Sequence, residues 1–132
     1  MADKNEVVKA LQDDSVALIH ALSPEEFTGV SSRYDRPGRI PGSDNVFCQS
    51  LIDPDTHAYL PPQRLRAIFE DTAALGADKV ITYCGGGIAA SSDALALTLL
   101  GKDNVAVYDG SLNEWTLDPD LPLETGQASP RA

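Results

Sequence analysis

Short, mostly apolar runs alternate along the chain with stretches in which apolar residues recur every three or four positions. The short runs, at residues 16–19, 45–47, 79–83 and 104–108, predict β-strands. The stretches with apolar residues every three or four positions, together with helix start and stop signals, predict helices at residues 5–12, 24–28, 61–75, 88–100 and 111–116. Strands that alternate with helices favour an α/β fold, in which a mainly parallel sheet has helices on both faces.

The most informative junction lies at Cys84, where the strand at residues 79–83 stops at a glycine triplet and an alanine-rich helix begins. Unpaired backbone N–H groups and the positive end of a helix dipole at such a junction favour thiolate over thiol. In parallel α/β folds, ligands bind beyond the carboxyl ends of the strands, where Cys84 would lie. The pattern therefore predicts Cys84 as an accessible catalytic nucleophile. The amides expected around its sulfur belong to Gly85, Gly86, Gly87, Ile88, Ala89 and Ala90.

Other interpretations of this junction are open. A cysteine at the end of a strand is often a small buried apolar residue, and glycines after a strand often form only a tight turn. A cysteine phosphatase would need an arginine six positions after the nucleophile, where this chain has Ala90. A dinucleotide site fits the spacing of Gly85, Gly87 and Ala90, but too little chain follows Asp109 to complete its sheet. Sulfur transfer through a persulfide fits best, because it needs only a thiolate and small residues that leave room for one more sulfur atom.

Composition narrows the classes of function. The chain has 132 residues, 42% of them hydrophobic and 23% charged, which fits one globular domain over residues 1–132 with a frayed tail from about residue 124. A net charge of −10 disfavours nucleic acid and anionic membranes as partners. No apolar run approaches the ~20 residues of a membrane helix, and the first residues lack the apolar core of a secretory signal. We therefore expect a cytoplasmic protein.

The cysteine count is the next constraint. Cys48 and Cys84 are the only cysteines, and two cysteines make neither a disulfide framework nor a metal-ligand cluster. Cys48 has no glycine loop beside it and should pack near a short strand, while a regulatory disulfide with Cys84 stays open. We expect no metal and no organic cofactor, because persulfide chemistry requires neither.

Three segments together resemble the rhodanese-type sulfurtransferases. Residues 84–89, CGGGIA, resemble the six-residue active loop of that family. Residues 38–46, GRIPGSDNV, are similar to its Gly-His-Ile-Pro-Gly-Ala-x-Asn-Val segment, and residues 108–115, YDGSLNEW, to its glycine-x-x-x-tryptophan close. The resemblance covers residues 16 to about 123 in the correct order. Within the family it is strongest to the catalytic second half of two-domain thiosulfate or mercaptopyruvate sulfurtransferases.

The resemblance implies a rhodanese-like α/β domain with a central, mainly parallel sheet of about five strands. It also implies that Cys84 is the sulfur carrier of a sulfurtransferase. The donor would be a small molecule similar to thiosulfate or mercaptopyruvate, and the acceptor a thiol, cyanide or a protein.

Two departures from the family pattern bear on activity. Family members commonly end the first strand with Asp-x-Arg, an ion pair that supports the active region, whereas this chain has His20-Ala21-Leu22. The residues after Cys84 are neutral, so donor selectivity does not carry over from the family. The alternative function is therefore a low-turnover binding or regulatory module that carries or senses persulfide for a protein partner.

Side chains outside the loop complete the expected site. Arg36 and Arg39 are the best candidates for contacts with an anionic donor, although pairing with nearby acids explains them equally well. His20, at the end of a buried strand, is expected to be a hydrogen-bonded core residue and not a base. Trp115 is expected to pack beneath the loop.

Overall fold

A parallel sheet forms the centre of the structure, a computed structural model that describes residues 1–31, 34, 36–86 and 88–126. Its strands are β1 (Val16–His20), β2 (Asp44–Asn45), β3 (Lys79–Tyr83) and β4 (Val105–Val107), in the order β2-β1-β3-β4. All neighbouring strands are parallel, as predicted. Within the described residues the sheet has four strands where about five were expected. A single parallel bridge between Ala2 and Tyr108 extends it beyond β4.

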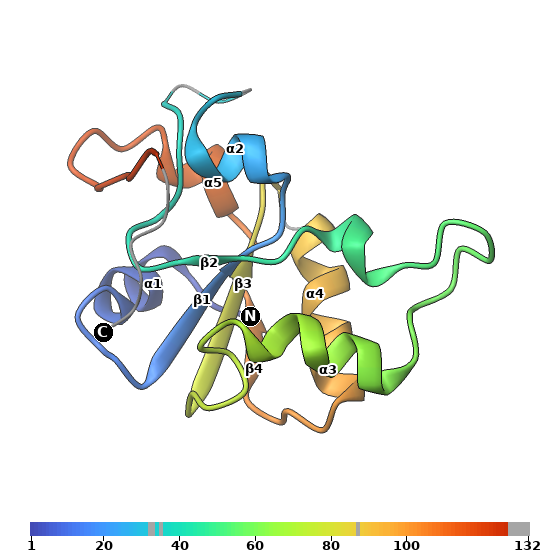
Figure 1. The fold of residues 1–132 in the computed structure, drawn as a ribbon. Coiled ribbons are helices and arrows are strands. Elements are labelled where there is room, and N and C mark those ends of the chain that lie inside the picture. The colour runs from blue at the N-terminus through green and yellow to red at the C-terminus, as the bar shows by residue number, and fades with distance from the viewer. Residues whose placement is uncertain (32–33, 35, 87, 127–132) are drawn as a thin grey trace.

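Helices cover both faces of the sheet, which confirms the predicted α/β class. They are α1 (Lys4–Ala10), α2 (Pro24–Thr28), α3 (Pro62–Glu70), α4 (Ile88–Leu99) and α5 (Ser111–Trp115), with one 3-10 helix, η1 (Cys48–Leu51). Figure 1 shows α1 on one side of the strands and α3 and α4 on the other. No helix of the described segments combines the length and the apolar character needed to cross a bilayer.

Side chains that alternate along the strands build two cores. Leu18 of β1 and Ile81 of β3 belong to a cluster with residues of α1 and α5. Ile19 and Val80, one position away, belong to a second cluster with residues of α3 and α4. Successive side chains of a strand point to opposite faces, so continuous apolar runs are what a sheet covered on both faces requires.

Helix α3 differs most from the sequence prediction. Helix α3 ends at Glu70 instead of continuing to residue 75, because the Ala73 amide donates to Asp44 Oδ2 and the Ala74 amide to Thr72 Oγ1. At the start of the predicted frayed tail, the Gly126 N–H donates to Thr28 O at 2.7 Å, and residues 127–132 lie outside the described residues.

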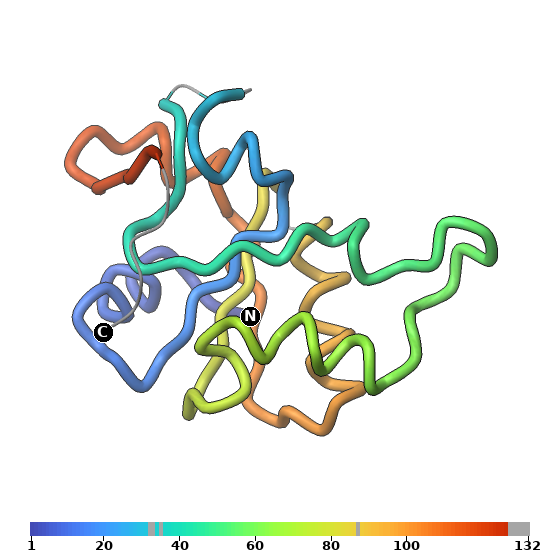
Figure 2. The backbone as a smooth tube through the Cα atoms, in the orientation of Figure 1, coloured from blue at the N-terminus to red at the C-terminus, as the bar shows by residue number. Residues whose placement is uncertain are grey.

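The segment between η1 and α3 extends away from the sheet (Figure 2). Asp53 shapes this loop, because its Oδ1 accepts the amides of Asp55 and Thr56 at 2.8 and 3.4 Å. His57 is exposed on it with φ at 60°. Cys48, at the start of η1, lies beside the carboxyl edge of the sheet, because its N–H donates to Ala21 O directly after β1.

Candidate active site

Cys84 directly follows β3, at the carboxyl edge of the sheet where the sequence predicted it. Its side chain is only 2% exposed and belongs to the apolar cluster beneath α1 and α5. Tyr34 packs against this cluster, and a Cβ added to Gly85 would lie 1.8 Å from the Tyr34 hydroxyl oxygen. The position of the residue is as expected, whereas the expected accessibility of its sulfur is wrong for this conformation.

The backbone on both sides of Cys84 is held by the start of α5. The Cys84 N–H donates to Ser111 Oγ at 3.0 Å, and the Cys84 carbonyl accepts the Leu112 amide at 3.0 Å. The Gly85 carbonyl accepts the Asn113 amide at 2.9 Å. Ser111 was not singled out from the sequence, because the residue that its hydroxyl would meet lies far away along the chain.

Several backbone N–H groups follow Cys84 in the loop and at the start of α4. The N–H groups of Gly85 and Gly86 donate to no acceptor among the described residues. Helix α4 starts at Ile88, and the first amides of any α-helix have no acceptor within the helix, which here concerns Ile88, Ala89 and Ala90. Gly87, also predicted to contribute an amide, lies outside the described residues. The Ile88 side chain is 89% exposed and Ala90 is buried, so this helix start lies at the surface on one side only.

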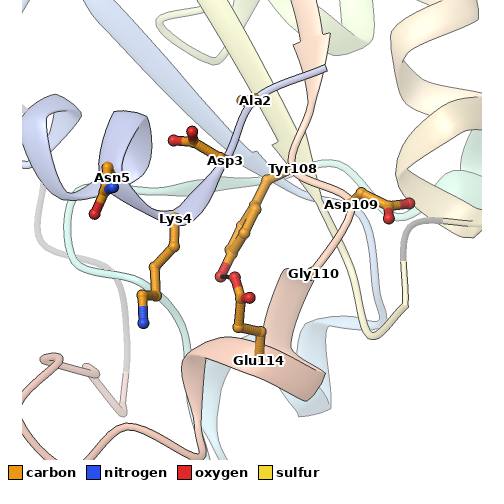
Figure 3. Close-up of a pocket in the computed structure, with 8 residues that line it drawn as sticks. All are labelled: Ala2, Asp3, Lys4, Asn5, Tyr108, Asp109, Gly110 and Glu114. Carbon is orange, nitrogen blue, oxygen red and sulfur yellow. Dashed lines mark hydrogen bonds between the residues drawn. The ribbon is translucent and has the colours of Figure 1, made fainter.

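The turn at residues 108–111 explains the third signature segment. The Tyr108 hydroxyl donates to Glu114 Oε1 at 2.6 Å, and a Cβ on Gly110 would lie 2.6 Å from the same oxygen (Figure 3). Ser111 has φ at 50° and donates its hydroxyl to Tyr108 O at 2.7 Å. Trp115, fully buried as predicted, donates from Nε1 to Pro122 O. The segment is therefore a structural support that aims the Ser111 hydroxyl at the Cys84 amide.

The second signature segment is tied to the residue that precedes the cysteine. Tyr83 Oη accepts the Ile40 amide at 3.0 Å and lies 2.7 Å from Ser43 Oγ. Ser43 Oγ donates to Ile40 O at 2.6 Å, so the Tyr83 hydroxyl donates to Ser43. Burial raises the pKa of Tyr83. This buried network fixes the end of β3 against residues 38–46.

Hydrogen bonds and aromatic contacts hold the end of β1, where this chain has His20-Ala21-Leu22. Asn45 Nδ2 donates to His20 O at 3.1 Å and to Leu22 O at 2.9 Å. The His20 ring makes edge contacts with Phe27 and Tyr83. Burial and the charge of Arg39 lower the pKa of His20 to about 4, and its Nδ1 accepts the Leu22 amide. His20 is thus a neutral core residue, as predicted.

Both candidate arginines donate to backbone carbonyls. Arg36 donates to Thr116 O, Asp118 O and Leu121 O, at 3.3, 2.8 and 2.7 Å. Arg39 is 3% exposed, lies over the Phe27 ring, and donates to Phe27 O and Gly126 O. It also pairs with Glu124 at 3.6 Å. These contacts give both arginines a structural role, and the role in donor binding stays an untested prediction.

One buried acid near the site was missed. Asp93 lies on the buried face of α4 with Ala90, Ala96 and Leu97, and it is 0% exposed. Burial raises its pKa to about 8. A single acid within a helix that is apolar on nearly all sides was the available signal. The described residues contain no group of three or more His, Cys, Asp or Glu side chains that could hold a metal ion.

The chain is similar to known sulfurtransferases in sequence. A model described as "Rhodanese-like domain" matches residues 3–118. The Arabidopsis thaliana protein "Thiosulfate/3-mercaptopyruvate sulfurtransferase 1, mitochondrial" is 33% identical over 129 residues, which are 95% of this chain and 34% of that protein. "Thiosulfate/3-mercaptopyruvate sulfurtransferase 2" of the same plant is 37% identical over 109 residues, 83% of this chain and 30% of that protein.

A solved structure with the same fold is the anaerobic ergothioneine biosynthesis enzyme from Chlorobium limicola, in complex with trimethyl histidine. It matches with a TM-score of 0.87 and 27% identity over 96% of this chain and 32% of that chain. The chain spans about a third of the length of these relatives. The rhodanese-like domain model covers residues 3–118, most of the chain, and the chain therefore belongs to the rhodanese-like domain family.

Proposed function

We propose that this chain is a sulfurtransferase that carries a sulfane sulfur as a persulfide on Cys84. The observation that carries the proposal is the position of Cys84 at the carboxyl end of β3, beside the start of α4 and the amides of Gly85 and Gly86, which have no acceptor among the described residues. Backbone N–H groups of this kind stabilise an anionic sulfur. The names of the curated relatives, thiosulfate and 3-mercaptopyruvate sulfurtransferases, support the same reaction class.

In the first step, the Cys84 thiolate attacks the outer sulfur of a donor similar to thiosulfate or mercaptopyruvate. A new S–S bond forms on Cys84, and the bond that held that sulfur to the donor breaks, with its electron pair leaving on the donor fragment. With thiosulfate as the donor, the fragment that leaves is sulfite. The amides of the glycines beside Cys84 stabilise the persulfide anion.

In the second step, a thiol or cyanide attacks the outer sulfur of the persulfide, and Cys84 leaves as thiolate. The reaction is a double displacement that needs no metal and no organic cofactor. One structural neighbour is described with ergothioneine covalently linked with a persulfide cysteine, which supports a persulfide on this fold.

A second candidate is a low-turnover module that carries or senses persulfide for a protein partner. The 2% exposure of Cys84 favours it, because a buried sulfur exchanges slowly with bulky acceptors. Both candidate functions use a persulfide on Cys84, and they differ in whether its sulfur passes rapidly to a small acceptor.

The test is a turnover assay with thiosulfate, 3-mercaptopyruvate and inorganic polysulfide as donors and cyanide or glutathione as acceptor. We expect the wild-type chain to turn over at least one donor and Cys84→Ser to lose about a thousandfold or more of that rate. Mass spectrometry should show one added sulfur atom on Cys84. If the wild type equals Cys84→Ser with every donor but still holds the sulfur, the second candidate stands in place of the first.

A further inference from the structure

Cys48 is a second thiol beside the candidate site, and neither the fold nor the persulfide step uses it. It opens η1, is partly exposed, and forms no disulfide. Cys84, by contrast, is 2% exposed. A sulfur atom carried by Cys84 therefore lies deeper than the nearby thiol of Cys48.

Backbone hydrogen bonds place the two cysteines on opposite sides of the end of β1. The Cys48 N–H donates to Ala21 O at 3.0 Å, and the Ala21 N–H donates to Tyr83 O at 2.9 Å, directly before Cys84. Adjacent strands are about 4.8 Å apart, so about 10 Å separates the two cysteine backbones. A disulfide requires Cα atoms within about 7 Å. A persulfide on Cys84 extends the reach of this residue by one S–S bond of about 2 Å, so transfer of its outer sulfur to Cys48 does not require a direct disulfide between the two cysteines.

Asp93 is an independent sign of chemistry at this place. Helix α4 packs against η1, and the fully buried Asp93 carboxyl oxygens hydrogen-bond to none of the residues that the structure describes. Burial, the charge of Asp93 and the charge of Cys84 all raise the pKa of Cys48, in that order of size. Asp93 and Cys84 therefore both lie close enough to Cys48 to act on its thiol. A buried carboxyl group without a partner is costly and calls for a functional explanation.

We infer that Cys48 takes the sulfane sulfur from Cys84 and presents it to acceptors, with Asp93 receiving the proton that Cys48 gives up. This inference rests on the proposed function, since it begins from the Cys84 persulfide. The Cys48 sulfur attacks the outer sulfur, an S–S bond forms on Cys48, and the S–S bond of Cys84 breaks with its electron pair leaving on Cys84.

The step balances without an external oxidant or reductant. A Cys84 persulfide, a Cys48 thiol and an Asp93 carboxylate become a Cys84 thiolate, a Cys48 persulfide and an Asp93 carboxylic acid. The pKa of Asp93, about 8, leaves about one carboxyl group in ten ionised at pH 7. A thiol in solution then takes the sulfur from Cys48, and Asp93 releases its proton.

Tryptic peptides separate the two cysteines, so the sulfur can be located. Cys48 lies in residues 40–64 and Cys84 in residues 80–102. The chain is loaded with inorganic polysulfide, desalted, and alkylated at timed intervals before digestion and mass spectrometry. Discharge to glutathione is then measured. The variants are Cys48→Ser, Cys84→Ser and Asp93→Asn, with Gln49→Ala, an exposed neighbour on η1, as the matched control.

We expect the added sulfur first in residues 80–102 and then in residues 40–64. Cys48→Ser should keep it on Cys84 and discharge it about tenfold more slowly. Asp93→Asn should slow the appearance of the sulfur on Cys48 without slowing the loading of Cys84. A purely structural defect would not change the ratio of these two rates. Gln49→Ala should behave as the wild type.

Three results would overturn this inference while leaving the proposed function intact. Cys48→Ser could discharge at the wild-type rate, Cys48 could gain sulfur equally fast in Cys84→Ser, or the sulfur could never reach Cys48. An unchanged rate of transfer in Asp93→Asn would remove Asp93 from the mechanism. A wild-type Cys84 that never gains sulfur from any donor would overturn the proposed function and this inference together.

Discussion

Ser111 holds the backbone of Cys84 with a hydroxyl group that is fully buried. Its Oγ accepts the Cys84 amide at 3.0 Å and donates to Tyr108 O at 2.7 Å. Ser111→Ala should leave the Cys84 amide buried without an acceptor, which costs about 1–3 kcal/mol in the free energy of unfolding. We also expect slower loading of Cys84 with sulfur. Urea unfolding and the mass-spectrometric loading rate measure the two effects.

Ser50 offers the matched control for this change. Its hydroxyl also donates to the carbonyl three residues earlier, Phe47 O at 2.7 Å, but Ser50 is exposed and does not contact Cys84. Ser50→Ala should change the free energy of unfolding by less than about 0.5 kcal/mol and leave loading unchanged. Equal effects of the two substitutions would contradict the role given to Ser111.

At the residue scale, the sequence predicted the positions of side chains that are set by neighbours along the chain, and it missed contacts with residues that are distant along the chain. Cys84 could be placed because a strand, a glycine triplet and a helix follow one another directly. Arg36 could not be interpreted, because its acceptors lie at Thr116, Asp118 and Leu121. The burial of Cys84 depends likewise on Tyr34 and on residues of α1 and α5 that pack over the sheet.

Two glycines on the segment that leads to β2 test how the tail is attached. Gly38 has φ at 107°, and a Cβ there would lie 2.1 Å from Glu124 O. Gly42 has φ at 83° with nothing within 4 Å of an added Cβ. Gly42→Ala should therefore cost only the left-handed strain, about 1–2 kcal/mol. Gly38→Ala should cost at least about 3 kcal/mol, because the backbone of Glu124 must also move.

Guanidinium unfolding of both variants measures the difference. Hydrogen exchange should in addition show faster exchange of the Arg39 and Glu124 amides in Gly38→Ala, because these two residues exchange backbone hydrogen bonds at 2.9 and 2.8 Å. If the two alanine variants are equally stable, the tail does not pack on Gly38 as described.

At the element scale, helix starts were easier to predict than helix ends. The short helix α2 runs as predicted, because Ser23 Oγ accepts the Glu26 amide and Gly29 ends it with φ at 87°. The apolar spacing of α3 continues past Glu70, yet the helix stops there, since Asp44 and Thr72 take the next amides. A local pattern carries no information on such a bond to another strand.

The whole molecule brings three separated signature segments to one edge of the sheet. Their sequence and order were sufficient to predict the α/β class and the parallel sheet. The number of strands was harder, because β2 has only two residues and the bridge from Ala2 adds a single pair to the other edge. A two-residue strand is too short to show apolar alternation, and the Ala2 bridge depends on how the start of the chain docks on the sheet.

Two buried titratable groups, His20 and Asp93, set the pH dependence of stability, because folding lowers the pKa of the first and raises the pKa of the second. The pKa of His20 falls from 6.5 to about 4 on folding, so between these values the unfolded chain binds the extra proton and stability rises with pH. The pKa of Asp93 rises from 3.8 to about 8, so the folded chain binds the extra proton and stability falls with pH. Each slope is about 1.4 kcal/mol per pH unit.

Between pH 4 and 6.5 the two slopes cancel, so the free energy of unfolding of the wild type should be nearly independent of pH. From pH 6.5 to 8 only Asp93 titrates, so the free energy of unfolding should fall. Urea unfolding across this range can separate the two groups. Asp93→Asn should gain stability from pH 4 to 6.5 and then stay level, because only His20 remains. His20→Asn, whose amide oxygen can replace Nδ1 as acceptor of the Leu22 amide, should lose stability steadily from pH 4 to 8. Parallel curves for Asp93→Asn and the wild type would mean that Asp93 is ionised in the folded chain at neutral pH, because a carboxyl charged in both states contributes no slope.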